Sequence, residues 1–207
     1  EQFWKGYEWN LGGSQPTLSY GITGATTSND YAQSSSDANH RWHNESYPGY
    51  GVSNPATHTS CKDLPNVNEM TWYAAAGDPR WDSDELWTIM GHLYKGGMWF
   101  KKKADISGYN AYTAFDGTDW RTNGNGNNWP VSQTLPSAAD VGNYFYLPTS
   151  GHYDSNRLIA VGHDGLYWSS SASPWYSNFA YMLYFTSGNV YVGNGSRNKG
   201  YRVGVFE

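Results

Sequence analysis

The chain has 207 residues, enough to bury the core of one large domain or of one domain with an extension. With 11 Trp, 18 Tyr and only 15% charged residues, it lacks the composition of an intrinsically disordered protein. The net charge of −5 argues against nucleic-acid binding, which needs a basic face.

No apolar run is long enough to span a bilayer, so no membrane span is predicted. The basic run at 101–103 follows an apolar stretch, and we interpret it as a solvated end. Cys61 is the single cysteine, which leaves no internal disulfide and makes packing the source of stability.

Residues 1–60 are rich in Gly, Ser, Thr, Asn and Tyr and contain few aliphatic residues. A disordered tail is one interpretation of this segment. Its aromatic residues favour the other interpretation, an ordered extension packed on the main domain, 61–207. Its main apolar anchors are Phe3, Trp4, Tyr7 and Trp9.

Two spacings typical of a capping box predict two short amphipathic helices. Asn66 is followed three residues later by Glu69, which predicts a helix that ends at 77–79. Asp82 and Glu85 repeat the spacing and predict a second helix through 86–93, with the glycines at 96–97 as its stop.

The residues that follow the predicted helices, 98–147, are aromatic and rich in Gly and Asn, and we expect strands and long loops there. Two helices followed by many short strands predict an α+β fold, in which the helices are segregated from a twisted antiparallel sheet. The main aromatic segments of these strands and loops are Met98–Phe100, Tyr109–Phe115, Trp120, Trp129 and Tyr144–Leu147.

The C-terminal segment, 165–206, combines two layers of residues. Apolar residues recur at every second position, which places them on one side of a sheet. They are Tyr181, Leu183 and Phe185, then Val190 and Val192, then Tyr201, Val203 and Val205. Between them lie mainly Asn, Ser, Tyr, Thr and Gly, the residues that antibody binding loops use. The same residues also mark turns between strands, and composition alone leaves both interpretations open.

Two runs in this half of the chain resemble a known signature. They are FYLPTSGHY at 145–153 and VGHDGLYWSSS at 161–171, followed by AYMLYFTSGNV at 180–190 and then Arg197, Gly200 and Val203. The first two runs resemble "FLPxxGYR … VGxxGxYWSSS" of the Fibrobacter major paralogous domain. This domain belongs to the sulfatase-modifying-factor branch of the C-type lectin-like fold. The runs are also similar to variable proteins of diversity-generating retroelements, including phage tropism determinants.

The resemblance covers about 61–207 and is most specific over 145–207. MGHLYKGGMW at 90–99 is weakly similar to surface proteins of gut Bacteroidales. One residue departs from the family pattern: Gly204 stands where the family has an arginine, and Arg202 precedes that place.

In retroelement variable proteins, adenine-directed mutagenesis rewrites codons near the C-terminus, and the changed side chains form a solvent-exposed binding face on a fixed scaffold. The resemblance implies that the scaffold includes a buried Trp168, with Leu183, Phe185, Val190, Val192 and Val203. It implies that the ligand-binding face consists of Ser173, Trp175, Tyr176, Asn178, Phe179, Met182, Thr186, Asn189, Tyr191, Asn194, Ser196, Asn198 and Lys199.

The sequence contains few of the residue patterns that a catalytic site or a metal site needs. The formylglycine-generating enzymes of this branch use a pair of cysteines that bind copper, and this chain has only Cys61. The calcium-binding motifs of C-type lectins are missing, and the acidic loop at 116–119 lacks EF-hand spacing, which favours a plain surface loop. The six histidines show no metal-binding spacing. We therefore expect no enzyme activity, no cofactor, no catalytic residue and no metal site.

The residues and the resemblance together predict a ligand-binding or receptor-binding protein displayed on a cell surface or a phage particle. Its partner would be a protein or glycan on another cell or surface. A non-diversified adhesin or glycan-binding module of the same fold is the first alternative, and a formylglycine-generating enzyme is the second. Phage relatives present such domains as trimers, so a homo-oligomer is left open.

Overall fold

The computed structural model describes residues 61–207 except 90–91, 155–156, 175–178, 198 and 205. The predicted extension, 1–60, lies outside the described residues. The helices are α1 (Val67–Ala75) and α2 (Trp120–Asn123), with 3₁₀ turns at Lys103–Asp105 and Val141–Asn143. The strands are β1 (Arg80–Ile89), β2 (His92–Lys101), β3 (Asn127–Pro130), β4 (Tyr144–Pro148), β5 (His152–Asp154), β6 (Arg157–Ile159), β7 (Gly165–Ala172), β8 (Phe179–Phe185) and β9 (Asn189–Ser196).

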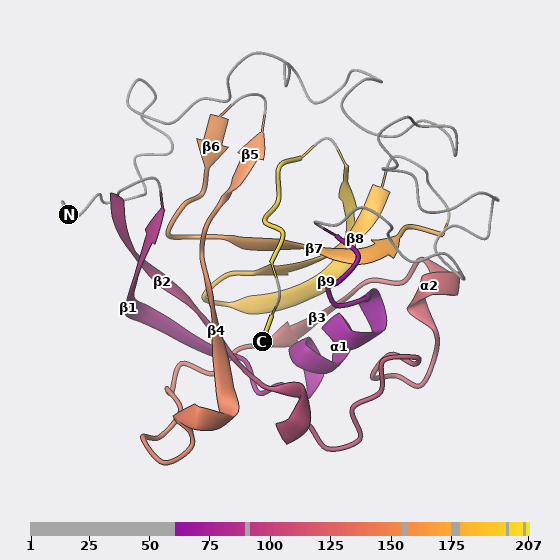
Figure 1. The fold of residues 1–207 in the computed structure, drawn as a ribbon, viewed down its shortest axis with the longest axis horizontal. Coiled ribbons are helices and arrows are strands. Elements are labelled where there is room, and N and C mark those ends of the chain that lie inside the picture. Colours follow the sequence, from indigo (N-terminus) through magenta and orange to yellow (C-terminus); the bar gives the residue numbers. More distant parts are fainter. Residues whose placement is uncertain (1–60, 90–91, 155–156, 175–178, 198, 205) are drawn as a thin grey trace.

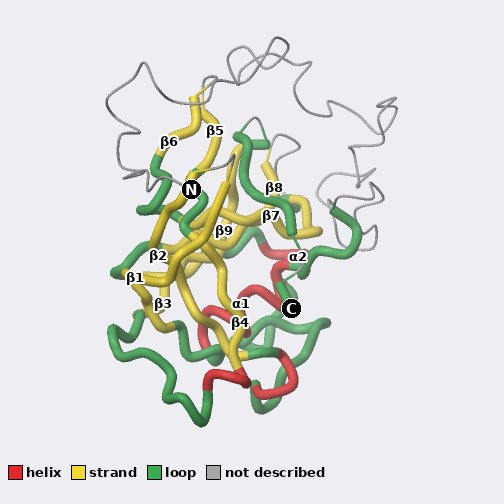
Figure 2. Tube along the Cα trace, turned by 60° about the vertical axis from the view of Figure 1, so that its left-hand side comes forward, coloured by secondary structure: helices red, strands yellow, loops and turns green. Residues whose placement is uncertain are grey.

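The strands form three antiparallel sheets of unequal size. Their orders are β1-β2-β4, β3-β9-β8-β7 and β5-β6. Helix α1 packs against β7, β8 and β9, and the helices and long loops gather at one end of the molecule (Figures 1 and 2). The coarse class, α+β with a mostly antiparallel sheet, is confirmed. No helix among the described residues is both long and apolar enough to cross a membrane.

Helix α1 begins where its capping box predicts. Glu69 N donates to Asn66 Oδ1 (3.1 Å), and Asn66 N donates to Glu69 Oε2 (2.8 Å), so two otherwise unpaired donors are satisfied. Met70 and Tyr73 on its inner side are buried in the main core. That core lies between α1 and the two larger sheets, and Phe100 and Phe185 bring the sheets together at 5.8 Å between ring centroids.

The predicted second helix is wrong, because residues 80–101 form the hairpin β1–β2. Asp82 does make the local bonds of a helix cap, since Oδ1 accepts from Asp84 N (2.9 Å) and Glu85 N (3.0 Å). These bonds instead stabilise a bulge, where the register of β1 shifts between Asp82 and Leu86. Beyond the bulge, Trp87 stacks on its cross-strand partner Tyr94 at 4.9 Å, a pairing that a helix would not allow.

Tyr109–Phe115, one of the segments expected to be strands or long loops, forms no strand. The structure has a loop there, held against α1 by hydrogen bonds to its backbone. Met98–Phe100 and Tyr144–Leu147 do lie in strands, β2 and β4, which pair with each other. Trp129 lies in β3, whereas Trp120 begins α2.

Candidate binding face

The inner face of the four-stranded sheet carries the predicted framework. Leu183 and Val192 pair across β8 and β9 and are fully buried, as are Tyr181, Phe185 and Val190. The alternation of apolar residues is therefore confirmed at these five positions. Because they fill the core beside α1, the hairpin β8–β9 is held by side chains that do not face solvent.

The prediction that Trp168 is buried beneath the sheet is wrong. Trp168 pairs with Met182, so it lies on the outer face, where it is half-buried against Tyr201 at 4.3 Å between ring centroids. The buried aromatic residue of β7 is Tyr167, because it is Tyr167 that pairs with Leu183. Pairing with a core strand decides which residue of β7 points inward.

Val203 is also misassigned as a scaffold residue. It lies beyond β9 with 42% of its surface exposed. Its neighbour Arg202 fills a structural place instead: Arg202 N donates to Leu166 O, and Arg202 O accepts from Trp168 N, both at 2.9 Å. The guanidinium carbon of Arg202 lies 6.0 Å from the centre of the Tyr167 ring. Arg202 therefore braces β7 in a chain whose expected arginine position is Gly204.

Most of the predicted binding residues that the structure describes lie at one or the other end of the hairpin β8–β9. Thr186 and Asn189 lie at its turn, whereas Phe179 and Ser196 pair with each other at its open end. Strand β8 runs between the two ends and has 7 residues, a length of roughly 20 Å at about 3.3 Å per residue. A small ligand at one end does not reach the other.

The turn residues bond mainly to one another. Thr186 Oγ1 donates to Asn189 Oδ1 (3.1 Å) and accepts from Gly188 N (3.2 Å), while Asn189 Nδ2 donates to Asn128 Oδ1 (2.8 Å). Such bonds are typical of turn-forming side chains. At this end of the hairpin the structure favours the interpretation of Asn and Thr as turn determinants.

Two predicted contact residues are too buried to meet a ligand directly. Ser173 is fully buried, and Met182 is buried beside Gly195, where the Trp168 and Tyr201 rings also pack. A Cβ on Gly195 would lie 2.7 Å from the Tyr201 ring and 3.3 Å from the Trp168 ring, so glycine is needed for this close packing. The outer face is thus partly covered, and the prediction of exposure is wrong for Ser173 and Met182. Tyr191, on the same face, is half-buried.

The open end of the hairpin brings together the largest group of predicted residues. Phe179, Asn194, Ser196 and Lys199 are half-buried there, at the ends of β8 and β9 or just beyond. Asn194 is two residues after the buried Val192 on β9, so its side chain points to the same, inner face of the sheet, next to Tyr181. Four further predicted residues lie outside the described residues: Trp175, Tyr176, Asn178 and Asn198.

Sequence reasoning missed Arg197 as a member of this end. Its Nε donates to Phe179 O at 3.1 Å, which fixes the first residue of β8. Burial lowers the pKa of Arg197 to about 10, so the guanidinium still carries its charge at neutral pH. Its place in the family pattern, after β9, was the only signal in the sequence.

Asn194 presents an unsatisfied acceptor at the open end. Its Oδ1 is buried and has no hydrogen-bond partner among the residues that the structure describes. A buried acceptor without a partner costs about 1–3 kcal/mol, and such groups call for a water or a ligand. Because this oxygen is buried on the inner side next to Tyr181, a buried water is the donor that would satisfy it, and a ligand on the outer face does not reach it.

The strand β5 forms the neighbouring wall of this end. Tyr153 exchanges two backbone hydrogen bonds with Gly200, at 3.0 and 2.9 Å. His152 on β5 contacts the Tyr201 ring edge-to-face at 5.5 Å. Lys199 forms an ion pair with Asp154. The short hairpin β5–β6 thereby fixes the chain that leaves β9.

His152 makes the stability of this wall sensitive to pH. Burial lowers the pKa of His152 below its ordinary 6.5, against the opposing charges of Asp164 and Asp154 and with the help of Lys199. The unfolded chain therefore binds the proton more readily, and the free energy of unfolding should fall as the pH drops below about 6.5. Urea unfolding at pH 7.5 and pH 5.5 measures this loss.

The matched variants are His152→Gln and His163→Gln. His163 is exposed, with 65% of its side chain accessible, and serves as the control. The loss of stability between pH 7.5 and pH 5.5 should shrink in His152→Gln and persist in His163→Gln. Equal losses in the wild type and both variants would contradict the assignment to His152.

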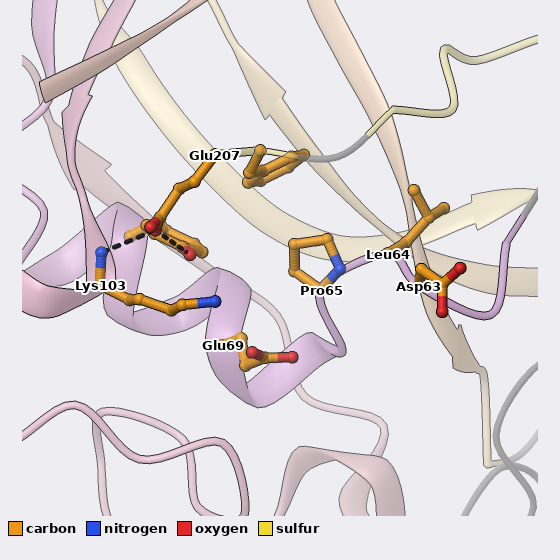
Figure 3. A pocket seen from close by; sticks show the side chains of 8 residues that line it. Asp63, Leu64, Pro65, Glu69, Lys103 and Glu207 are labelled. Carbon is orange, nitrogen blue, oxygen red and sulfur yellow. Dashed lines mark hydrogen bonds between the residues drawn. The ribbon is translucent and has the colours of Figure 1, made fainter.

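A small pocket lies beside α1, near the last residues of the chain (Figure 3). The Glu207 carboxylate accepts from Tyr73 Oη and from Lys103 N, both at 2.6 Å. Burial, with the Glu207 carboxylate, raises the pKa of Tyr73. The cavity measures about 90 Å³, well below the roughly 300–1,000 Å³ of ordinary ligand pockets. We therefore interpret this site as structural: its hydrogen bonds attach the C-terminal residues to α1.

The carboxylates of the acidic loop at 116–119 form hydrogen bonds and an ion pair with neighbouring residues of the chain. Asp116 accepts from Trp120 Nε1 and Thr118 N, each at 2.9 Å, and Asp119 pairs with Arg121 at 2.7 Å. Within the described ranges, no three His, Cys, Asp or Glu side chains are grouped to hold a metal ion.

Comparisons of the chain with protein-family models, curated proteins and solved structures gave no match. The family resemblance in the motifs remains a prediction.

Proposed function

We propose that this chain is a ligand-binding protein of the C-type lectin-like fold, displayed on a cell surface or phage particle. Its binding face is the open end of the hairpin β8–β9, and in the fullest form of the proposal a diversity-generating retroelement varies that end. The partner is a protein or glycan on another surface.

The observation that carries the proposal is that the buried framework residues of β8 and β9 are distinct from the half-buried residues at the open end of this hairpin. The buried residues of β8 and β9 pack on α1 and the second sheet, whereas Phe179, Asn194 and Ser196 are only half-buried at the strand ends. If the side chains of a binding face are varied, the backbone that carries them must be held by other, invariant side chains, here the buried residues of β8 and β9.

The test is a library randomised at five predicted positions. They are Trp175, Tyr176, Asn178, Ser196 and Asn198. If these positions form a binding face, changes there stay within about ±0.5 kcal/mol each, so most members should keep a melting temperature within about 5 °C of the parent. Selection of the library against streptavidin as a test protein should then yield binders.

The control library varies Ser173, Met182, Thr186 and Asn189. Because these residues are buried or tie the turn, most of its members should lose stability and yield no binders. If the first library fails to fold, or if it folds and yields no binder, the open end is not a binding face. Retroelement diversification is tested separately: it requires a near-copy of the 3′ coding end, differing at adenines, beside a reverse transcriptase gene.

A further inference from the structure

The loop between the turn at Lys103–Asp105 and α2 carries partly exposed aromatic rings that pack beside Trp72 of α1. Phe115 is 47% exposed and stands nearly perpendicular to Trp72, at 5.3 Å and 84°. Trp72 in turn contacts Tyr109 at 6.3 Å. Gly108 lies against the edge of the Trp72 ring, where a Cβ would be 3.5 Å from it. These rings form a continuous aromatic strip, defined as Trp72, Tyr109 and Phe115.

Tyr112 on the same loop is the most exposed large apolar residue of the described chain, with 75% of its surface accessible. Burial of apolar surface drives folding, and rings left in water in this way do not contribute to it. Tyr112 and Phe115, three residues apart on one loop, are both exposed, and grouped exposed apolar side chains of this kind mark interaction sites.

The loop is held in place without using these exposed rings. The carbonyls of Ala111 and Tyr112 accept from Asn66 Nδ2 and Asn68 Nδ2 on α1, at 2.9 and 3.0 Å. Thr71 Oγ1 accepts from Phe115 N at 2.9 Å. Because α1 fixes the backbone, the rings of Tyr112 and Phe115 are presented in a preformed arrangement, which lowers the entropy lost on binding.

The charged groups that flank the strip are hydrogen-bonded within the protein, including Asp116 beside Phe115, which accepts from Trp120 Nε1 and Thr118 N, each at 2.9 Å. Arg121 donates to both carboxylate oxygens of Asp119, at 2.8 and 2.7 Å, and Glu69 accepts from Tyr109 Oη at 2.7 Å. The exposed neighbours Asn110 and Thr118 bring amide and hydroxyl groups. The surface therefore offers aromatic faces and neutral hydrogen-bonding groups, while the Glu69 and Asp116 carboxylates beside it accept hydrogen bonds from uncharged donors, an arrangement that disfavours an anionic ligand.

We propose that the aromatic strip, together with Tyr112, is a second binding surface, whose ligand is a neutral saccharide. A pyranose ring has a face of C–H groups, which packs on the negative face of an aromatic ring, and hydroxyls around its rim for neutral donors and acceptors. This surface is separate from the open end of β8–β9, and the inference does not rest on the proposed function.

The test is affinity electrophoresis of the purified full chain in native gels that contain soluble neutral polysaccharides. The probes are a mixed-linkage β-glucan, a galactomannan, an α-mannan and starch. At least one should retard the wild type. Tyr112→Ala and Phe115→Ala should each weaken that retardation at least tenfold, measured as the dissociation constant, while Tyr112→Phe keeps it.

Leu135→Ala is the matched control, because Leu135 is as exposed as Phe115 but lies on another loop. It should change neither retardation nor melting temperature, and the melting temperature of Tyr112→Ala should also equal that of the wild type. Absence of retardation by all four polysaccharides overturns the proposal. So does retardation that survives the double variant Tyr112→Ala/Phe115→Ala. Sedimentation that shows a dimer abolished by the double variant would assign the strip to a second copy of the chain instead.

Discussion

Tyr167→Ala is expected to lower the free energy of unfolding by about 3–5 kcal/mol, the range for truncating a buried aromatic side chain. The Tyr167 ring stacks on Phe185 at 6.0 Å and meets Phe206 edge-on at 5.9 Å, and its hydroxyl donates to Pro148 O at 2.7 Å. Its removal opens a cavity where both sheets and the C-terminal residues meet. In a domain of this size the melting temperature should fall by about 10 °C or more.

The neighbouring Trp168 is the matched control for this experiment. It is larger than Tyr167 but only half-buried on the outer face, so Trp168→Ala should cost only about 1–2 kcal/mol. Tyr167→Phe, which removes only the hydrogen bond to Pro148, should also cost about 1–2 kcal/mol. Urea unfolding measures the free energy of unfolding of the three variants, and Tyr167→Ala should lose the most. A Trp168→Ala loss larger than that of Tyr167→Ala would show that the inner and outer faces of β7 are reversed.

The sequence predicts those parts of the fold that depend on local interactions or on simple alternation. The capping box of α1 needs only Asn66 and Glu69, three residues apart, and both of its hydrogen bonds are present. The alternation from Tyr181 to Val192 predicts the inner face of β8 and β9. In both cases the information lies within a few residues of the element that it defines.

The failures occur where distant residues decide the outcome. Asp82 and Glu85 have the spacing of a helix start, but Trp87 pairs with Tyr94 across a hairpin and joins a cluster with Leu158 and Val161. That cluster forms only in the folded chain, so no local pattern contains it. Tertiary packing of this kind overrides helix propensity.

The candidate site was only partly predictable for the same reason. Alternation does not distinguish Tyr167 from Trp168 as the inward residue, because the pairing with Leu183 and the bulge after Trp168 set the phase of β7. Nor does composition separate Thr186, which ties a turn, from Asn194, which keeps an unsatisfied oxygen at the open end. Side chains of similar chemistry acquire different roles from their position along the hairpin.

Asn68 is the polar residue whose replacement should disturb the fold most. It is fully buried on α1, where Nδ2 donates to Tyr112 O (3.0 Å) and Asp119 Oδ1 (2.9 Å), and Oδ1 accepts from Trp120 N (2.9 Å). Asn68→Ala leaves these groups without their partner, at about 1–3 kcal/mol for each buried group that stays unpaired. We expect a total loss of about 3 kcal/mol or more in urea unfolding.

The matched control for Asn68→Ala is Asn110→Ala, on the same loop. Asn110 Oδ1 accepts from Tyr112 N in an exposed hydrogen bond, so its loss should cost at most about 1 kcal/mol. Asn68→Ala should also weaken the protection of the amide hydrogens of Tyr112 and Trp120 against exchange, while Asn110→Ala leaves that of Trp120 unchanged. Equal effects of the two variants would mean that Asn68 does not hold the loop to α1.

Asn68→Asp separates the loss of hydrogen bonds from the loss of volume, because it keeps the shape of the side chain. It retains an acceptor for Trp120 N but places a second carboxylate where Nδ2 now lies 2.9 Å from Asp119 Oδ1. Two carboxylates this close raise the pKa of one of them in the folded state. The folded state then binds the proton more readily than the unfolded chain, so the destabilisation should be greatest at neutral pH and should shrink on acidification. This trend is opposite to the loss expected from His152, and unfolding curves of the variant and the wild type at pH 7.5 and pH 5.5 will distinguish them. A deficit that stays constant or grows toward pH 5.5 would place the new carboxylate away from Asp119.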